Sequence, residues 1–151
     1  MEKLTKHPAL SFAEAAREAY RKLFVCKGRS RRSEYWWAFL IVAVAKLACI
    51  ATAFTSVYVS RLLTLALLPA TIRRLHDTGR SGWWAAGWFA LDAASTTTVL
   101  LVRKLGQVAL TASTIVGLVT IAYITAMVVF LCKDSHKEAN KYGPSPKYEA
   151  R

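Results

Sequence analysis

The sequence predicts an all-helical protein that crosses a membrane about four times and carries an additional amphipathic helix near its N-terminus. Three observations support this prediction. Hydrophobic residues make up 54% of the chain, and the mean hydropathy is positive at +0.28, although the formal net charge is +12. The charges gather at the ends of long apolar segments, whereas a soluble domain intersperses them. Those segments are long enough to cross a bilayer.

Most of the basic residues lie in three short parts of the chain. Residues 1–34 hold nine Lys or Arg against four acids, residues 73–80 hold three against one, and residues 132–151 hold five against three. Basic flanks of membrane helices favour the cytoplasmic side, where they meet anionic headgroups. We therefore interpret the positive charge as a sign of membrane orientation, and we expect no nucleic-acid partner because no reader motif accompanies it.

The three cysteines, Cys26, Cys49 and Cys132, are far apart and form no C-x-x-C pair. Their spacing predicts neither a disulfide framework nor a zinc site. We expect no metal, no cofactor and no catalytic residue. The first apolar run begins only near Tyr35, too far from the N-terminus for a signal peptide, so the first span is expected in the mature protein.

Residues 1–34 are expected to form a basic cytoplasmic segment that contains the amphipathic helix. Ser11 and Glu14 have the spacing of a capping box, which places the helix start near Phe12. Such a helix either lies on the membrane surface or packs on the ends of the spans, because both arrangements bury the same face. That face holds apolar residues at spacings of three and four, namely Phe12, Ala16, Ala19, Tyr20 and Leu23.

The apolar segments are predicted to form a transmembrane bundle over residues 35–131. Residues 35–72 would make one helix of about 57 Å at 1.5 Å per residue, nearly twice the ~30 Å hydrocarbon core. We therefore predict a hairpin that turns near Thr55 and Ser56, with Pro69 kinking its second helix or ending the regular part. The predicted spans cover residues 35–54, 57–75, 83–102 and 108–131.

The first span is expected to enter from the cytoplasm, because three aromatic residues follow the basic segment at residues 35–37. Four spans then return the C-terminus to the cytoplasm, where residues 132–151 form a tail. Residues 140–146 of this tail, Asn-Lys-Tyr-Gly-Pro-Ser-Pro, are expected to make a rigid turn that packs on the cytoplasmic loops.

Three ordered motifs resemble a known bacterial family. They are Gly-Arg-Ser-Arg-Arg-Ser-Glu-Tyr-Trp at residues 28–36, Arg-Arg-Leu-His-Asp-Thr-Gly-Arg-Ser-Gly-Trp-Trp at residues 73–84, and the motif at residues 140–146. Over roughly residues 20–147 the chain resembles the inner-membrane family of unknown function called domain of unknown function 805. The resemblance implies a helical protein of the bacterial cytoplasmic membrane, and it implies no catalytic or binding residues.

A basic cluster on the predicted cytoplasmic face is the first candidate site. Arginine side chains bind phosphates bidentately, and glycine amides can form an anion-binding nest. The cluster either binds an anionic lipid, a phosphorylated ligand or an acidic partner protein, or it locks the bundle through ion pairs that include Glu34. Its predicted members are Arg29, Arg31, Arg32, Arg73, Arg74, His76, Asp77 and Arg80.

Lys46 and Asp92 are the second candidate, as an intramembrane charge pair. At 1.5 Å per residue they lie ~16 Å and ~14 Å from the predicted cytoplasmic boundary, and charges at such depth usually pair inside the bundle. The pair is either a structural salt bridge or part of a path for ions or small solutes.

The third candidate is residues 79–82, Gly-Arg-Ser-Gly, which match a short pattern around the serine nucleophiles of intramembrane proteases. Ser81 would be the nucleophile, and His76 or His136 would be its base. A glycine-rich turn, however, needs these residues for its backbone alone.

Together these patterns predict a non-enzymatic membrane module that acts by binding at its basic cytoplasmic face. The main alternative is a small channel or transporter subunit that uses Lys46 and Asp92, and a membrane serine hydrolase is the third. The expected partners are membrane lipids, with a second copy or another membrane protein also possible.

Overall fold

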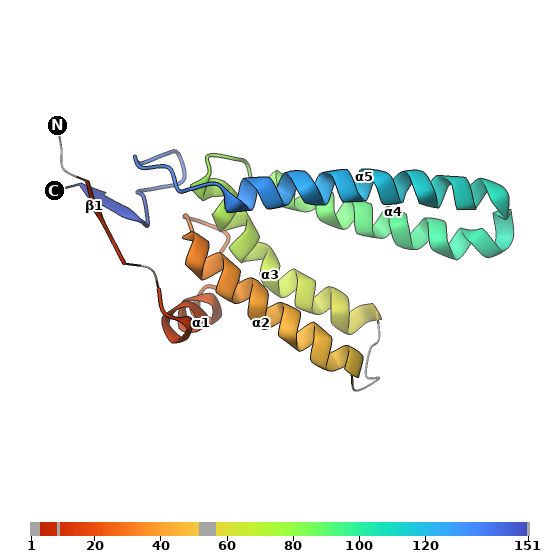
Figure 1. Ribbon diagram of the computed structural model, residues 1–151, viewed down its shortest axis with the longest axis horizontal. Helices are drawn as coiled ribbons and strands as arrows, with labels where there is room; N and C mark the ends of the chain where they lie inside the picture. Colours follow the sequence, from red (N-terminus) through yellow and green to blue (C-terminus); the bar gives the residue numbers. More distant parts are fainter. Residues whose placement is uncertain (1–3, 9, 52–56, 151) are drawn as a thin grey trace.

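A computed structural model describes residues 4–8, 10–51 and 57–150 of the chain. This part contains five α-helices and one sheet of two short strands. Four of the helices form two antiparallel hairpins, which meet at one end and diverge toward the other (Figure 1). Both ends of the chain lie at the end where the hairpins meet (Figure 1).

The first hairpin consists of α2 (Arg32–Ala51) and α3 (Val57–Asp77), and the second consists of α4 (Trp83–Leu105) and α5 (Gln107–Cys132). These four helices occupy the four apolar segments on which the predicted spans were placed. Their bounds differ from the predicted spans by only a few residues.

The differences within the first hairpin concern its ends and its proline. α2 begins one turn before the predicted start at Tyr35, and α3 continues two residues past Leu75. α3 also runs through Pro69 as one helix, so the proline does not end it. The predicted turn at Thr55 and Ser56 lies outside the described residues.

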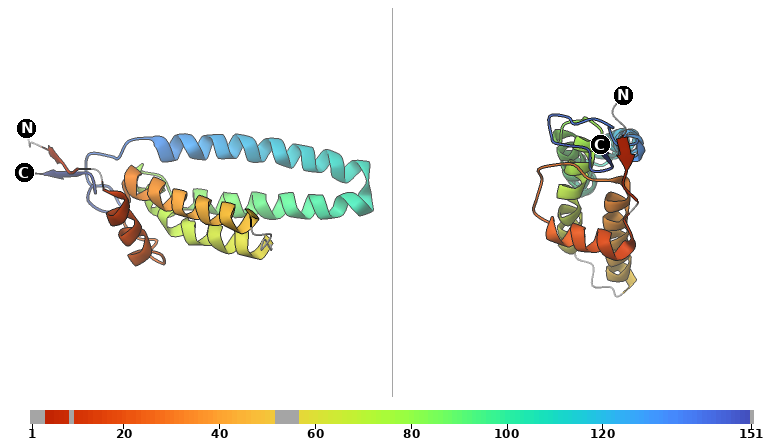
Figure 2. Two further views of the ribbon diagram at one scale, coloured as in Figure 1. Left: turned by 60° about the horizontal axis from the view of Figure 1, so that its bottom comes forward. Right: turned by 90° about the vertical axis from the view of Figure 1, so that its left-hand side faces the viewer.

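The helix α1 (Phe12–Arg21) begins where the sequence predicts. The backbone amide of Ser11 donates to the Glu14 carboxylate at 2.9 Å, and the Glu14 amide donates to the Ser11 hydroxyl at 3.4 Å. The predicted capping box is thus confirmed, and it satisfies amides that the first helical turn leaves unpaired. α1 runs crosswise to α2 and packs against it (Figure 2).

A single residue, Gly106, connects α4 to α5. Its φ of +53° lies in the left-handed region, which residues with a Cβ atom rarely adopt. The Gly106 amide also donates to the Val102 carbonyl at 3.0 Å, which closes the end of α4. Glycine therefore allows the chain to reverse direction within one residue.

The helical class is confirmed, and two short strands, β1 (Leu4–Lys6) and β2 (Tyr148–Ala150), add to the helices a feature that the sequence did not predict. They pair antiparallel, with Leu4 opposite Ala150 and Lys6 opposite Tyr148. Strands of three residues carry no alternating pattern that a sequence analysis could detect, and their partners lie at opposite ends of the chain. The sheet holds the N-terminal and C-terminal segments together.

The packed core lies at the end where the two hairpins meet. All four long helices contribute buried side chains to it: Tyr35, Ala38, Ala70, Leu75, Ala85, Met127 and Leu131. Farther along, the helices turn apolar side chains outward, and more than half of the surface of Leu47, Leu62, Val108 and Ile115 is exposed. Apolar surface of this kind marks a region that contacts a membrane or a partner.

By length and composition, one helix in the described part of the chain, α5, is long and apolar enough to cross a membrane. Its most apolar 18 residues have a mean hydropathy of 2.5, and only 11% of them are buried. The apolar core helix of a soluble protein would instead be mostly buried.

Candidate functional site

A group of buried charged side chains, here called the buried arginine network, lies at the end where the hairpins meet. Its members are at most 7% exposed, and they are Arg29, Glu34, Arg73, Arg74 and Asp77. They come from the loop before α2, the first turn of α2 and the last turns of α3. The predicted convergence of residues 28–34 with residues 73–80 is therefore confirmed.

Asp77 is the centre of this network. Its carboxylate accepts hydrogen bonds from Arg29 Nε at 2.9 Å, from Arg74 Nη1 at 2.5 Å and from Ser135 Oγ at 2.5 Å. One carboxylate thus serves two buried guanidinium groups, so their other donors need neutral acceptors. The remaining Arg29 donors find these acceptors in the C-terminal tail, at the carbonyls of His136, Glu138 and Gly143.

Arg74 closes the C-terminal end of α5. It donates from Nε to the Leu131 carbonyl at 3.0 Å and from Nη2 to the Lys133 carbonyl. The last carbonyls of a helix have no partner within the helix and carry partial negative charge, which a cation stabilises. Arg74 therefore joins the end of α3 to the end of α5.

Arg73 plays the corresponding role for the segment after α1. It pairs with the Glu34 carboxylate at 3.2 Å, and its Nη1 donates to the Lys22 carbonyl at 2.8 Å and to the Val25 carbonyl. Arg73 therefore ties the segment after α1 to α2, through Glu34, and to α3, which carries Arg73 itself.

These geometries favour the structural interpretation for three of the predicted anion-binding residues. Arg29, Arg73 and Arg74 are buried and donate to protein carbonyls and carboxylates rather than facing solvent. Removing one partner from such a group would leave a buried charge unpaired, which is costly. The sequence located the cluster but did not reveal that these three of its arginines are buried.

The predicted rigid turn of the tail packs on His76, which lies beside the buried arginine network. The imidazole stacks on the Tyr142 ring with a centroid separation of 3.7 Å and an interplanar angle of 6°. Its Nδ1 lies 3.2 Å from the Gly28 carbonyl, and the Asn140 side chain donates to the His76 carbonyl at 2.9 Å. The expectation that residues 140–146 pack on the loops is confirmed.

The two remaining arginines of the first segment make peripheral contacts. Arg31 donates to the Pro8 carbonyl at 2.9 Å, and the half-exposed Arg32 pairs with Asp134 at 3.2 Å. Asp134 also accepts from the Lys147 ammonium at 2.5 and 2.6 Å. The hydrogen bond from Lys147 is the main reason that the pKa of Asp134 lies below its usual value.

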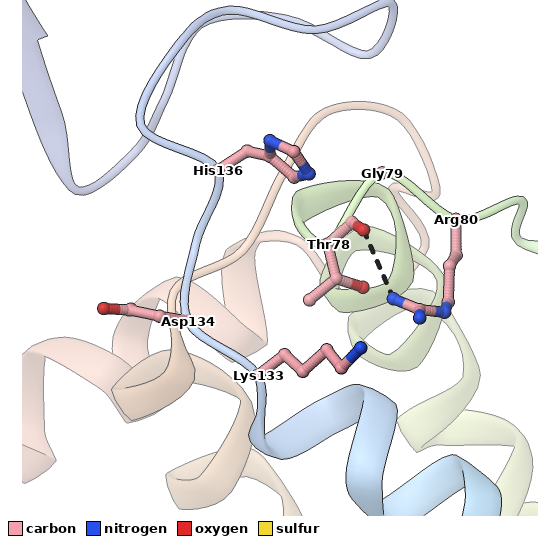
Figure 3. A pocket seen from close by; sticks show the side chains of 6 residues that line it. All are labelled: Thr78, Gly79, Arg80, Lys133, Asp134 and His136. Atoms are coloured by element: carbon pink, nitrogen blue, oxygen red, sulfur yellow. Dashed lines mark hydrogen bonds between the residues drawn. The ribbon is translucent and has the colours of Figure 1, made fainter.

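An open hollow of about 430 Å³ lies beside the network, between the turn after α3 and the segment after α5. We call it the Arg80 hollow, and its lining residues are Thr78, Gly79, Arg80, Lys133, Asp134 and His136 (Figure 3). Figure 3 shows the Arg80 and Lys133 side chains pointing toward one another, whereas the Asp134 carboxylate points away from them. The hollow therefore presents two cations and an imidazole.

Neighbouring groups hold Arg80 in position. Its Nη1 donates to the Thr78 carbonyl at 3.4 Å, and its guanidinium carbon lies 3.9 Å from the centre of the Phe130 ring on α5. A cation over an aromatic face gains electrostatic attraction while its other donors stay accessible. Gly79 has a φ of +76°, and a Cβ atom there would lie 3.4 Å from His136 Nε2.

The sequence placed Arg80 in the basic cluster and His136 only as a possible base for Ser81, and it missed Lys133 as a site residue. A signal was present, because the positive-inside pattern predicts that the basic residues immediately after the last apolar segment lie on the same side as the loop at residues 73–80. Only the fold, however, places the start of the tail against that loop.

The predicted ion pair between Lys46 and Asp92 is wrong. Both residues are described, and the Lys46 ammonium donates to Thr64 Oγ1 at 2.7 Å, while Asp92 pairs with Arg61 at 3.2 Å. α3 packs against both α2 and α4, so each of the two charges meets a partner on α3 instead. Equal depth along the helices therefore did not bring the two charges together.

Ser81, the predicted nucleophile, is exposed, and its hydroxyl accepts a hydrogen bond from the Trp83 amide at 3.3 Å. It lines a second hollow of about 430 Å³ that His76 also lines, but the described contacts of His76 go to Gly28, Asn140 and Tyr142. Within the described residues, no group of three or more His, Cys, Asp or Glu side chains is arranged to hold a metal ion.

Comparison with known proteins identifies the family. Residues 23–144 match the family described as protein of unknown function, DUF805. The chain is 31% identical over 129 residues to inner membrane protein YhaI of Escherichia coli K12, covering 80% of this chain and 85% of that protein. It is 26% identical over 136 residues to inner membrane protein YhaH of the same strain, covering 82% and 88%. No solved structure matches significantly. The chain therefore belongs to the DUF805 family.

Proposed function

We propose that this protein is a multi-pass protein of the bacterial inner membrane, with α2 to α5 crossing the bilayer and both termini in the cytoplasm. Its relatives YhaI and YhaH are named inner membrane proteins. The four helices turn apolar side chains outward, and the basic segments gather at the end that holds both termini. Basic flanks favour the cytoplasmic side, which gives this orientation.

We further propose that the Arg80 hollow binds the phosphate of an anionic lipid headgroup. The observation that carries this proposal is the convergence of Arg80, Lys133 and His136 on one open hollow. Guanidinium, ammonium and imidazole groups all donate hydrogen bonds to phosphate oxygens. Unlike the arginines of the buried network, the Lys133 and His136 side chains are exposed.

The position of the hollow favours a lipid over a soluble phosphate. It lies where α3 and α5 end, and α4 begins nearby with Trp83, which is 84% exposed. Tryptophan side chains prefer the headgroup level of a bilayer. In the proposed topology a phosphate in the hollow would therefore lie at the depth of the cytoplasmic headgroups.

Lipid retention by matched variants tests this proposal. The purified protein would be titrated with phosphatidylglycerol in detergent and the bound lipid counted by native mass spectrometry. Each basic residue near an anionic group is worth about 1 kcal/mol, so Lys133→Gln and Arg80→Gln should each weaken retention roughly fivefold. Lys137→Gln removes another exposed lysine of the same segment, outside the hollow, and should change retention less than about twofold.

The controls separate the possible ligands. If Lys137→Gln weakens retention as much as Lys133→Gln, the lipid is held by diffuse charge and the hollow is not a site. If inorganic phosphate displaces phosphatidylglycerol at equal concentration, the ligand is a soluble phosphate rather than a lipid. Unchanged lipid retention in both Lys133→Gln and Arg80→Gln would contradict the proposal.

A further inference from the structure

The N-terminal helix α1 has an apolar face that the protein covers only in part. On one flank Ala15 is fully buried and Phe12 contacts Trp37 of α2, with ring centroids 5.1 Å apart. On the other flank Tyr20 remains 81% exposed, and Phe24, three residues after the helix, is 90% exposed. Packing against α2 therefore leaves one edge of the apolar face open.

The helical geometry shows that this edge is continuous. Successive helix residues are rotated by about 100°, so Phe12, Ala16 and Tyr20, at spacings of four, fall within roughly 80° of one another. Arg17 and Arg21 lie farther around the helix on the polar side, and both are exposed. A basic sector thus borders an exposed aromatic edge, which is the pattern of helices that lie in a membrane interface.

The orientation of α1 aims this edge toward the proposed bilayer. α1 runs crosswise to α2, so it lies roughly parallel to a membrane that α2 crosses (Figure 2). Phe12, at the border between the covered flank and the open edge, contacts Trp37, which lies more than one turn into α2 from its N-terminal end. The apolar face that Phe12 shares with Ala16 and Tyr20 therefore lies on the side of α1 that faces along α2 toward the apolar part of the bundle.

We propose that Tyr20 and Phe24 insert into the cytoplasmic leaflet and that Arg17, Arg21 and Lys27 contact its anionic headgroups. One flank of α1 then packs against the bundle, and the other flank contacts the lipid. This inference depends on the proposed membrane topology but not on the Arg80 hollow. It joins the two arrangements that the sequence left as alternatives, because α1 packs on the protein and presents a second apolar edge beside it.

Lipid is the occupant that the charges favour. The segment from Arg17 to Lys27 carries four basic residues against one acid, Glu18, which already pairs with Lys22 at 2.8 Å. An acyl-chain boundary accommodates exposed aromatic rings, and anionic headgroups accommodate the basic sector beside them. A soluble environment would leave the two rings in water.

Site-directed spin labelling tests the insertion in the intact protein. Single cysteines would replace Tyr20, Phe24 or Arg21 in a background where the native cysteines are changed to serine. After reconstitution into vesicles that contain phosphatidylglycerol, labels at 20 and 24 should be reached by oxygen and protected from a water-soluble nickel chelate. Their depth should be about 5–10 Å below the headgroup boundary. The label at 21, on the polar side, should show the reverse accessibility and serves as the matched control.

A fourth label separates this inference from the topology. Leu118 is 63% exposed near the middle of α5, and its label should be reached by oxygen if α5 spans the membrane. If oxygen reaches the label at 118 but the nickel chelate reaches the labels at 20 and 24, the insertion is overturned and the topology still holds. If the nickel chelate reaches the label at 118, the topology itself is overturned. Protection of 20 and 24 from both reagents would mean that protein covers the edge, which also overturns the insertion.

Discussion

Replacing Asp77 by asparagine should strongly destabilise the protein. Asp77 is fully buried, and its carboxylate lies 2.9 Å from Arg29 Nε and 2.5 Å from Arg74 Nη1. Asparagine keeps the shape but removes the only negative charge that serves these two cations in the described network. Breaking a buried ion pair on one side typically costs about 3–5 kcal/mol, and here two arginines lose their counter-charge.

Equilibrium unfolding of the purified protein in mixed detergent micelles would measure this loss. Asp134→Asn is the matched control, because Asp134 also pairs with two basic residues but is about half exposed, at 48%. Exposed pairs contribute roughly 0–1 kcal/mol, so this control should change the free energy of unfolding only slightly. A loss below about 1 kcal/mol for Asp77→Asn would refute the account of the network.

A double variant tests whether the arginines share Asp77. In an Arg29→Met background only Arg74 remains to be stranded, so Asp77→Asn should cost less there than in the wild type. Residues in one network usually show coupling energies of about 0.5–3 kcal/mol. If the two losses simply add, Arg29 and Asp77 do not depend on each other and the 2.9 Å contact has no energetic role.

Two further outcomes concern charges outside the network. Lys46→Met and Asp92→Asn should destabilise additively within about 0.5 kcal/mol, because the two residues bind different partners on α3; a larger coupling in the same unfolding assay would restore the direct pair. The lowered pKa of Asp134 means that its contribution to stability is present above about pH 3.8 and is lost as the pH falls through its lower folded pKa. Lowering the pH from about 5 to about 3 should therefore reduce the melting temperature of the wild type more than that of Asp134→Asn, as measured by thermal denaturation. Equal losses of melting temperature would contradict this expectation.

Local patterns predicted the helices well. The capping box formed by Ser11 and Glu14 was identified from residue types alone, because its hydrogen bonds join groups three positions apart. The four apolar segments likewise predicted four helices with nearly correct bounds, since long runs of apolar residues have few alternatives to a helix. The convergence of two basic segments followed from the expected order of the helices.

Partner choice within the bundle did not follow from the sequence. Lys46 and Asp92 lie at similar predicted depths, and this similarity suggested a pair. Depth, however, specifies position along a helix and not which helix stands next to it. Because α3 packs against both neighbours, Lys46 meets Thr64 and Asp92 meets Arg61, two positions about one turn apart on α3.

The sequence by itself determined the helical class, the placement of the apolar segments and the gathering of charge at their ends, since each depends on composition and short-range spacing. Only the tertiary structure decided which arginines are buried and which face an open hollow. Arg74 and Arg80 lie within six positions in the same motif, yet Arg74 is fully buried against the end of α5 and Arg80 lines the hollow. The reason is physical: Arg74 can be buried because a distant segment, more than fifty residues away, brings backbone carbonyls to its guanidinium group.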